Sequence, residues 1–304
     1  MRQSWPGRVP VLRTRPAALA PFLPAAVESM DLSAYDVVVS SSVMFAKGVV
    51  TRTRTRHISY CYSPSRMLWD RNAEYERRGP LSRLARHWLR MWDANAAKRP
   101  DVMLAISGAV AGRIAKYYRR QSEVLHPPLL AAPTDRRMRS ASDLGYYLAV
   151  GRLLPHKNFG MLVDAFAKLN RPLVIVGDGP ERARLARRAP ANVHFVSADD
   201  RTLASWFAGC RALIVPNEED FGMTPVEAMS FGRPVLALRA GGALETVSEG
   251  VTGEFFDDAI PEALAEGVIR LEAGRYDGAL ITAHATKFNA SRFDARMKRL
   301  VSCR

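Results

Sequence analysis

The second half of the chain alternates short apolar runs with longer amphipathic stretches. The apolar runs cover 146–151, 173–177, 193–197, 212–216, 234–238 and 253–256. The stretches with apolar residues at helical spacing cover 159–169, 180–188, 199–208, 225–231, 243–249 and 261–273. Short strands that alternate with helices are typical of a parallel sheet covered on both faces. The pattern predicts an α/β, doubly wound domain.

The first half shows the same alternation with fewer elements. Strands are predicted at 35–41, 57–62, 101–107 and 122–128. A helix between the second and third strands carries an apolar stripe, which we expect to lie in the core rather than to anchor a membrane, because any amphipathic helix has this spacing. The stripe consists of Leu84, Trp88, Leu89 and Trp92. A full doubly wound sheet has about five or six strands, and residues 1–34 supply none, so this domain is predicted to be incomplete.

The chain of 304 residues is long enough for two domains. A polar, basic stretch at 131–143 indicates a linker, and residues 283–301 have the apolar spacing of a last helix. We therefore expect an N-terminal domain at 1–138, a C-terminal domain at 144–282 and a terminal helical segment at 283–304.

The chain carries a net charge of +14, and most of the excess lies in the first half. Basic residues cluster at 51–57, 77–90 and 134–139. Such a surface suits nucleic acid, anionic lipid or a phosphorylated substrate, and it is equally compatible with a solvated, arginine-rich face. Nucleic acid is the least favoured partner, because the arginines lack interleaved aromatic residues and a known reading motif.

Cysteine spacing and hydropathy limit the compartment. Cys61, Cys210 and Cys303 are odd in number and widely spaced, which fits neither a disulfide framework nor a zinc site. No apolar run reaches the roughly 18 residues of a membrane span, and prolines interrupt the N-terminal segment, unlike a signal peptide. We expect a cytoplasmic protein whose membrane contact, where it exists, is peripheral on the inner face of the plasma membrane.

The segment EEDFGMTPVEAMSFGRPVLAL, residues 218–238, places two carboxylates around the start of a helix. Thr224, Pro225 and Glu227 have the spacing of a capping box with proline at the first helical position, which gives Glu227 a structural role. Glu219 has no such role and follows the strand 212–216, at the edge where open α/β sheets bind ligands. The backbone amides from Phe221 to Thr224 are suited to a phosphate.

Two cations follow the first strand of the same domain. The segment VGRLLPHKN, residues 150–158, places Arg152 and Lys157 at this edge, where they can neutralise a diphosphate and stabilise it as a leaving group. The segment GDGPE at 177–181 is better explained as a tight turn than as a ligand contact. Cations for a diphosphate beside carboxylates for neutral hydroxyls indicate a sugar nucleotide.

In order and content, these segments resemble the retaining glycosyltransferases of family 4, whose GT-B architecture consists of two Rossmann-like domains. The matching segments are GRLLPHKN, VGDGPE, EEDFGMTPVEAMSFGRPVLA, GGALETV and GVTGEFF, which together span most of 146–256. Glu219 and Glu227 match the two acids of the family's E-x7-E motif.

The resemblance implies a role for each matching residue. Glu219 would contact hydroxyls of the donor sugar, and Glu227 the ribose of the nucleotide. Arg152 and Lys157 would bind the donor diphosphate. Backbone groups near the ligand would complete the site, contributed by Gly151, Phe221, Gly222, Met223 and Thr224. Enzymes of this family are usually independent of metal, so no cofactor is expected beyond the donor substrate.

The N-terminal half is similar to a narrower subgroup, bacterial mannosyltransferases that build lipid-linked polysaccharides. Residues 22–49 and 57–70 carry this likeness, and 288–301 resembles the terminal helix that crosses back to the first domain in this subgroup. The resemblance implies that a hexose, preferably mannose from GDP-mannose, is transferred with retention to a lipid-linked saccharide.

Two departures from the subgroup keep other functions open. Tyr62 stands where relatives place a histidine, and relatives begin upstream of Met1 with a strand and a glycine-rich loop, so truncation is expected. A non-catalytic homologue that binds a nucleotide sugar or a partner, and a sugar-nucleotide epimerase of similar shape, are therefore the alternatives.

Overall fold

The computed structural model describes residues 22–70, 79–129 and 143–302, and these form two compact units. Unit 1 comprises residues up to His126 together with Ala295 onward, and unit 2 comprises Pro127–Asp294. The predicted linker at 131–143 lies almost wholly outside the described residues. Each unit is described by itself.

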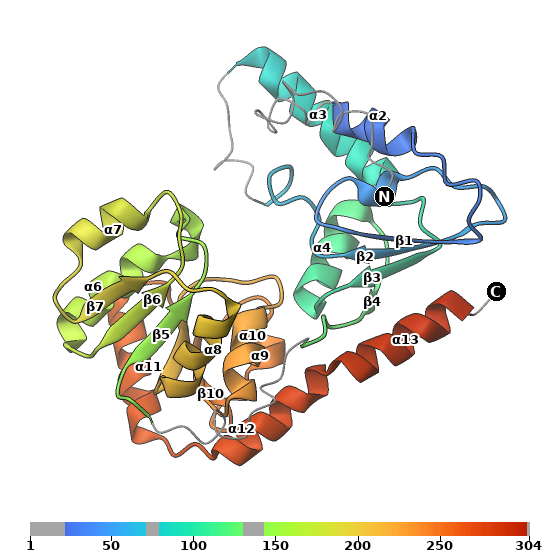
Figure 1. Ribbon diagram of the computed structural model, residues 1–304. Coiled ribbons are helices and arrows are strands. Elements are labelled where there is room, and N and C mark those ends of the chain that lie inside the picture. Colours follow the sequence, from blue (N-terminus) through green and yellow to red (C-terminus); the bar gives the residue numbers. More distant parts are fainter. Residues whose placement is uncertain (1–21, 71–78, 130–142, 303–304) are drawn as a thin grey trace. The chain divides into compact units, whose positions relative to one another are not determined.

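Unit 2 contains a six-stranded parallel sheet in the order β10-β9-β8-β5-β6-β7 (Figure 1). Its strands are β5 (Tyr147–Val150), β6 (Leu173–Val176), β7 (Val193–Val196), β8 (Ala212–Val215), β9 (Val235–Leu238) and β10 (Gly253–Phe256). All six predicted strands are confirmed within a residue or two. Renumbered within the unit, the order is 3-2-1-4-5-6 read from the β7 side, which is the doubly wound arrangement.

The helices of unit 2 follow the strands as predicted. They are α6 (Phe159–Leu169), α7 (Arg182–Arg188), α8 (Asp200–Gly209), α9 (Met223–Ser230), α10 (Ala243–Thr246) and α11 (Pro261–Ala273). Apolar side chains of α6 and α11 share one core with the sheet, in which Tyr147, Phe166 and Val268 are fully buried. Because the strands β5, β6, β8 and β9 are buried on both faces and read as continuous apolar runs, the sequence pattern was sufficient to find them.

The terminal helical segment is interrupted, which corrects the prediction of a single helix over 283–301. Helix α12 (Gly278–Ala285) is followed by a 3-10 turn, η7 (Thr286–Phe288), and then by α13 (Ala290–Ser302). Asn289 has an extended backbone, and its side-chain oxygen accepts a hydrogen bond from the Arg292 amide at 3.1 Å. This side-chain cap starts a new helix, so the apolar spacing continues across a break in the backbone.

Unit 1 contains a four-stranded parallel sheet in the order β1-β2-β3-β4. Its strands are β1 (Val37–Ser42), β2 (Arg56–Cys61), β3 (Val102–Ala105) and β4 (Glu123–Val124), at the four predicted places. The helices are α2 (Leu23–Glu28), η4 (Ala46–Gly48), α3 (Pro80–Ala96) and α4 (Gly108–Tyr118). Within this unit, Arg296 of α13 forms an ion pair with Glu123 of β4.

A buried carboxylate fixes α3 to the rest of unit 1. Asp93 is fully buried and forms an ion pair with Lys47, which is also buried. It also accepts hydrogen bonds from Trp69 Nε1 at 2.9 Å and from the Tyr118 hydroxyl at 2.8 Å. Because each partner satisfies a lone pair of the carboxylate, the buried charge is fully compensated.

The apolar stripe of α3 is only partly core, contrary to the prediction. Leu89 is buried, and Trp92 packs against the same small cluster. Leu84 and Trp88 are exposed. The predicted core role is therefore wrong for these two residues, because α3 contacts its unit along one edge of the stripe.

Two structural features bear on the expected compartment, the cysteines and the hydropathy of the helices. Cys61 and Cys210 are buried and form no disulfide bond among the described residues, and Cys303 lies outside these residues. Among the described helices, none combines the length and hydropathy needed to cross a bilayer.

Candidate functional site

The central strands of unit 2 place two loops side by side. β5 pairs with β8. The chain crosses from β5 to β6 in one direction along the sheet and from β8 to β9 in the other, because β6 and β9 lie on the outer sides of this central pair. In open α/β sheets this reversal creates a crevice outside the carboxyl ends of the two strands, where ligands bind. The loops that follow β5 and β8 are the two segments predicted to hold the site.

Asn158 joins these loops through its side chain. It ends the 3-10 turn η6 (Pro155–Lys157) with a left-handed backbone, φ 55°, and starts α6. Its side-chain amide donates to the carbonyl oxygen of Pro216, directly after β8, at 3.1 Å. The loop that carries Lys157 is therefore held against the loop that carries Glu219.

Lys157 and Glu219 form an ion pair at this position. Lys157 Nζ lies 2.5 Å from Glu219 Oε1, and the two side chains are 22% and 26% exposed. The buried Asn217 donates from Nδ2 to the same carboxylate oxygen at 3.1 Å. A cation and an amide thus orient one carboxylate, while both charged groups remain accessible to a ligand.

A glycine pair supports the Glu219 loop from the β9 side. Gly241 pairs with Glu219 in an isolated parallel bridge, and the Gly242 amide donates to the Glu219 carbonyl oxygen at 2.9 Å. A Cβ atom on Gly242 would lie 2.3 Å from Phe221 Cα, and one on Gly241 would lie 2.2 Å from the Glu219 carbonyl oxygen. Only glycine permits this approach of two backbones.

Helix α9 begins two residues earlier than the capping-box prediction requires. Its first residue is Met223, and its N-cap is Gly222, with φ 89° and no capping side chain. The predicted capping box of Thr224, Pro225 and Glu227 is therefore wrong: glycine turns the chain into the helix through its left-handed backbone. The first amides of α9 have no partners within the helix, so they can bind an anion.

The remaining predicted contacts lie in the same loops or in helix α9. Arg152 is exposed in the loop after β5, and no described contact joins it to Lys157 or Glu219. Glu227 lies half-buried in α9, and Phe221 is buried against Phe288, with ring centroids 5.5 Å apart. The structure thus brings Lys157 and Glu219 into contact. Arg152 lies in the loop that leads to Lys157, and Phe221 and Glu227 follow Glu219 closely along the chain.

The turn at 177–181 has the structural role that was predicted for it. Cβ atoms on Gly177 and Gly179 would lie 2.0 Å from the Gly151 carbonyl oxygen and 2.6 Å from that of Leu153. The Leu153 carbonyl also accepts a hydrogen bond from the Glu181 amide at 3.1 Å. The turn therefore packs directly beneath the loop that carries Arg152 and Lys157.

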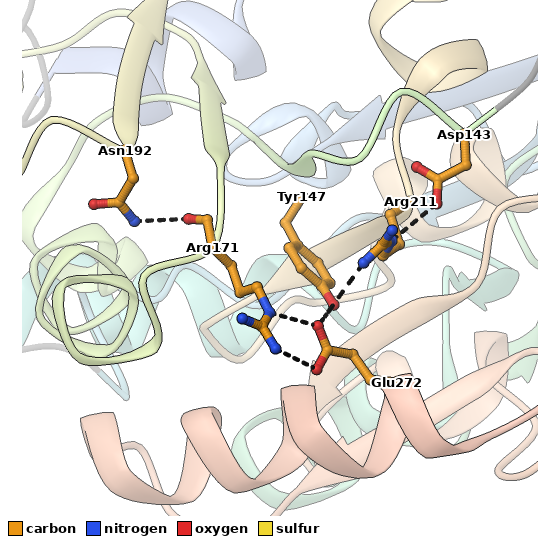
Figure 2. Close-up of polar contacts among 6 residues, drawn as sticks. All are labelled: Asp143, Tyr147, Arg171, Asn192, Arg211 and Glu272. Atoms are coloured by element: carbon orange, nitrogen blue, oxygen red, sulfur yellow. Dashed lines mark hydrogen bonds and ion pairs between the residues drawn. The ribbon is translucent and has the colours of Figure 1, made fainter.

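A polar cavity of about 750 Å³ lies at the opposite, N-terminal edge of the sheet. Figure 2 shows that two of the arginines lining it are already engaged: Arg171 and Arg211 point toward Glu272, and Arg211 also contacts Asp143. The third, Arg233, donates to the carbonyl oxygen of Ala208. The buried Tyr147 donates its hydroxyl to Glu272 at 3.0 Å. Because these charges largely cancel, we assign the cluster to the packing of α11 and not to ligand binding.

Two positioning features were missed by the sequence analysis. Asn217 was not singled out, although it directly precedes the acidic pair at 218–219, and Gly241 and Gly242 entered only as part of a resemblance. The paired glycines after strand 234–238 were the available signal, because adjacent glycines at a strand end often mark close backbone approach.

In unit 1, Tyr62 directly follows β2 and is partly exposed. Its hydroxyl accepts a hydrogen bond from Ser41 Oγ at 2.8 Å. Tyr60 contacts it edge to face, with ring centroids 5.5 Å apart. A hydrogen-bonded phenol therefore stands at the position where the mannosyltransferase subgroup is expected to place a histidine.

Comparisons with known proteins agree on one family. The sequence profile described as "Glycosyl transferases group 1" matches residues 134–290. An uncharacterized glycosyltransferase of Methanocaldococcus jannaschii is 30% identical over 58% of this chain and 51% of its own length. A GDP-mannose-dependent alpha-mannosyltransferase of Mycolicibacterium smegmatis is 32% identical over 65% of this chain and 54% of its own length. The chain thus spans about half the length of these curated relatives.

Solved structures share the fold at lower identity. Sucrose-phosphate synthase from Thermosynechococcus elongatus superposes with a TM-score of 0.72 at 20% identity, over 95% of this chain and 79% of that one. Anabaena HepE in complex with UDP and glucose superposes with a TM-score of 0.66 at 18% identity, over 97% and 83%. These matches confirm the predicted GT-B fold with two parallel sheets.

Proposed function

Because the chain belongs to the glycosyl transferases group 1 family, we propose that it transfers a hexose from a nucleotide diphosphate sugar, with retention at the anomeric carbon. The preferred donor is GDP-mannose and the acceptor a lipid-linked saccharide in polysaccharide assembly. The contact between Lys157 and Glu219 at the sheet's switch point carries the proposal, because it combines a phosphate ligand and a hydroxyl acceptor in one crevice.

The pair has a direct function in donor binding. A diphosphate in the crevice offers Lys157 a stronger partner than a single carboxylate, and the hydroxyls of the attached sugar donate hydrogen bonds to Glu219 in exchange. Asn217 keeps the carboxylate oriented while Lys157 changes partner. As the glycosidic bond to the diphosphate breaks, Lys157 and the exposed Arg152 stabilise the negative charge that develops on the leaving group.

The helix α9 completes the proposed donor site. Its first amides, at Gly222, Met223 and Thr224, bind the diphosphate, and Glu227 on the same helix accepts hydrogen bonds from the ribose. The charge on the leaving group is balanced by protein groups in this scheme, so no metal ion is required. The proposal names no protein nucleophile.

The choice of GDP-mannose is supported by relatives rather than by the site. The mannosyltransferase of M. smegmatis is GDP-mannose-dependent by name, whereas the HepE structure contains UDP and glucose. A direct comparison of donors therefore belongs in the test. The lipid-linked acceptor is supported by the resemblance of 22–49 and 57–70 to the polysaccharide mannosyltransferases.

Thermal unfolding with GDP, GDP-mannose and UDP-glucose tests the donor site. A ligand present at a hundred times its Kd stabilises the folded chain by about 2.7 kcal/mol. We expect GDP-mannose to raise Tm, Lys157→Met to abolish the shifts with both GDP and GDP-mannose, and Glu219→Gln to remove most of the difference between the shift with GDP-mannose and the shift with GDP.

A second Lys–Glu pair supplies the matched control. Lys168 and Glu262 form an exposed ion pair between α6 and α11 of the same unit. Lys168→Met and Glu262→Gln remove equal charges and should leave both ligand shifts unchanged. The proposal is wrong if no nucleotide sugar raises Tm, or if the Lys157 and Glu219 variants respond as the wild type does.

Tyr62 favours one alternative, a homologue that binds a nucleotide sugar without transferring the sugar. A phenol cannot carry the imidazolium charge of a histidine near neutral pH. Incubation with GDP-mannose, with and without a polyprenyl-linked saccharide, separates the two functions: released GDP with a glycosylated lipid supports transfer, and a Tm shift without released GDP supports binding alone.

A further inference from the structure

The start of helix α9 is fixed by the contacts of one buried ring, that of Phe221. This residue directly precedes the N-cap Gly222 and is 2% exposed. Its backbone lies against Gly242, where a Cβ atom would come within 2.3 Å of Phe221 Cα. Its ring meets the ring of Phe288 edge to face, with centroids 5.5 Å apart. Two parts of unit 2 that are distant in sequence therefore hold the residue from which the helix starts.

Phe288 is itself held in place on both sides of its ring. The side chain is 5% exposed, and the carbonyl oxygen accepts a hydrogen bond from the Leu129 amide at 2.7 Å. The Asn289 amide donates to the Thr286 carbonyl oxygen at 3.2 Å, and Asn289 pairs with Leu129 in an isolated parallel bridge. Leu129 and Asn289 belong to the two chain segments that connect unit 2 with unit 1, so both connections meet beside Phe288.

Helix α12, just before Phe288, supports the same loop from the β9 side. It packs against α9, and Nε2 of its His284 lies 3.0 Å from the carbonyl oxygen of Thr246 at the end of α10. Lys287 Nζ lies 3.3 Å from Nδ1 of the same ring. Because an ammonium group can only donate, Nδ1 accepts and Nε2–H donates to Thr246. Helix α10 follows the glycine pair that supports the Glu219 loop, so α12 and η7 brace both segments beside the site.

The position of Phe221 determines where the first amides of α9 point. Gly222 follows it with a left-handed backbone, φ 89°, and Met223 opens the helix. Glycine has wide conformational freedom, so this turn does not by itself fix the direction of the helix start. The neighbouring ring has to fix it. For a charged ligand group the placement is critical, because a displacement of about 1 Å can cost a hundred-fold in rate.

We propose that Phe288 is a positioning residue for the start of α9. Its ring fixes Phe221 and, through it, the first amides of the helix, which the proposed function assigns to the donor diphosphate. Phe288 itself contacts no ligand group in this scheme. The identity of the ligand rests on the proposed function, whereas the support of the helix start is a property of unit 2 alone, so the two proposals can fail separately.

A second aromatic pair supplies the matched control. Phe207 of α8 stacks on Phe231, the C-cap of α9, with ring centroids 5.8 Å apart. Phe207 is buried like Phe288, with 3% of its surface exposed. Phe207→Leu therefore removes an aromatic contact at the opposite end of the same helix, and it should lower the urea midpoint of unfolding about as much as Phe288→Leu does.

Hydrogen exchange of the ligand-free chain tests the support by itself. The Gly242 amide donates to the Glu219 carbonyl oxygen at 2.9 Å, so its exchange reports whether the loop before α9 keeps its place. We expect Phe288→Leu to speed this exchange by about ten-fold or more and Phe207→Leu to leave it unchanged. If Phe288→Leu does not fold, Phe288→Met, which fills a similar volume, takes its place in the comparison.

Calorimetry with GDP tests the link to the ligand. Phe288→Leu should weaken GDP binding by about ten-fold or more, whereas Phe207→Leu should keep the affinity of the wild type. In a double-mutant cycle of GDP affinity, Phe288→Leu should have little further effect in the presence of Phe221→Leu, because one ring acts through the other. A role in global stability alone would lower the free energy of unfolding without this coupling.

Three results would overturn the proposal. The first is unchanged exchange of the Gly242 amide in Phe288→Leu. The second is equal GDP affinity of the Phe288 and Phe207 variants, and the third is additivity of the Phe221 and Phe288 substitutions in the cycle. If the wild type binds no nucleotide and Phe288→Leu still speeds the exchange, the proposed function is refuted while the support of the helix start by Phe288 is confirmed.

Discussion

Replacement of Glu272 by alanine tests which contacts stabilise the N-terminal edge of the sheet in unit 2. Glu272 lies at the end of α11 and accepts hydrogen bonds from the buried Tyr147 on β5 and from the exposed Arg171 before β6 (Figure 2). One carboxylate therefore ties a helix to two strand ends. The question is which of its partners provides the stabilisation.

The burial of the partners sets the expected magnitude. The Tyr147 side chain is fully buried, so removal of its acceptor leaves a polar hydroxyl without its hydrogen bond, at a cost of about 1–3 kcal/mol in the free energy of unfolding. Arg171 remains solvated after the change and contributes much less. The neighbouring cavity allows water to approach the network, which favours the lower half of the range for Glu272→Ala.

A double-mutant cycle in urea measures the free energy directly. Tyr147→Phe removes the hydroxyl that requires the acceptor, so we expect Glu272→Ala to cost at least about 1 kcal/mol less in this background than in the wild type. Arg171→Ala should produce a clearly smaller change than Glu272→Ala. Equal costs of Glu272→Ala in both backgrounds, or an effect of Arg171→Ala as large as that of Glu272→Ala, would refute the reasoning.

The pH dependence of the same network has a defined sign. Hydrogen bonds from Arg171 hold the pKa of Glu272 below its ordinary value of 4.5. The folded state therefore binds this proton less readily than the unfolded state does. The contribution of Glu272 is present above pH 4.5 and decreases as the pH falls through the lowered pKa, and Glu272→Gln should flatten this part of the stability profile.

Four further outcomes follow from the site and from unit 1. Gly242→Ala should weaken GDP-mannose binding by about ten-fold or more in calorimetry, because its Cβ overlaps the Phe221 backbone and displaces the loop. Asn217→Ala should lower kcat more than it changes GDP affinity, since it orients Glu219 and touches no phosphate. Burial lowers the pKa of His57 to about 4, so the folded state binds this proton less readily than the unfolded state does. In urea titrations the free energy of unfolding should therefore decrease as the pH falls from 6.5 to 4, and His57→Gln should remove this decrease. EDTA should leave the transfer rate unchanged, because protein cations serve the leaving group in the proposed scheme.

The strands beside the site, and the sheet edge at which its loops lie, could be predicted because both signals are local. Strands β5 and β8 are short, fully apolar runs, and each loop residue is placed at an edge as soon as its strand is known. The positions of Lys157 and Glu219 follow from this reasoning, although their contact does not. That contact depends on β5 and β8 being neighbours, which is a property of the whole sheet.

The errors arose where a single turn or cap residue, or the packing of the core, overrides the sequence pattern. Thr224 and Glu227 have capping-box spacing, but Gly222 turns the chain earlier. The apolar positions of 283–301 continue through Asn289, where a side-chain cap restarts the helix. For α3 the hydrophobic period was correct, yet it could not show that the core covers Leu89 and leaves Leu84 exposed.

The pairing of Lys157 with Glu219 also determines which ligands the proposed site prefers. A ligand that carries only phosphate binds Lys157 and leaves Glu219 without its cation. The lost ion pair offsets part of the free energy of binding. A nucleotide sugar compensates both groups at once, because its hydroxyls donate to the released carboxylate while its diphosphate accepts from the lysine. Under the proposed function, GDP-mannose should therefore bind more tightly than GDP. Glu219→Gln removes the carboxylate charge from which Lys157 must separate, so this variant should bind GDP more strongly and show a smaller difference in affinity between the two ligands.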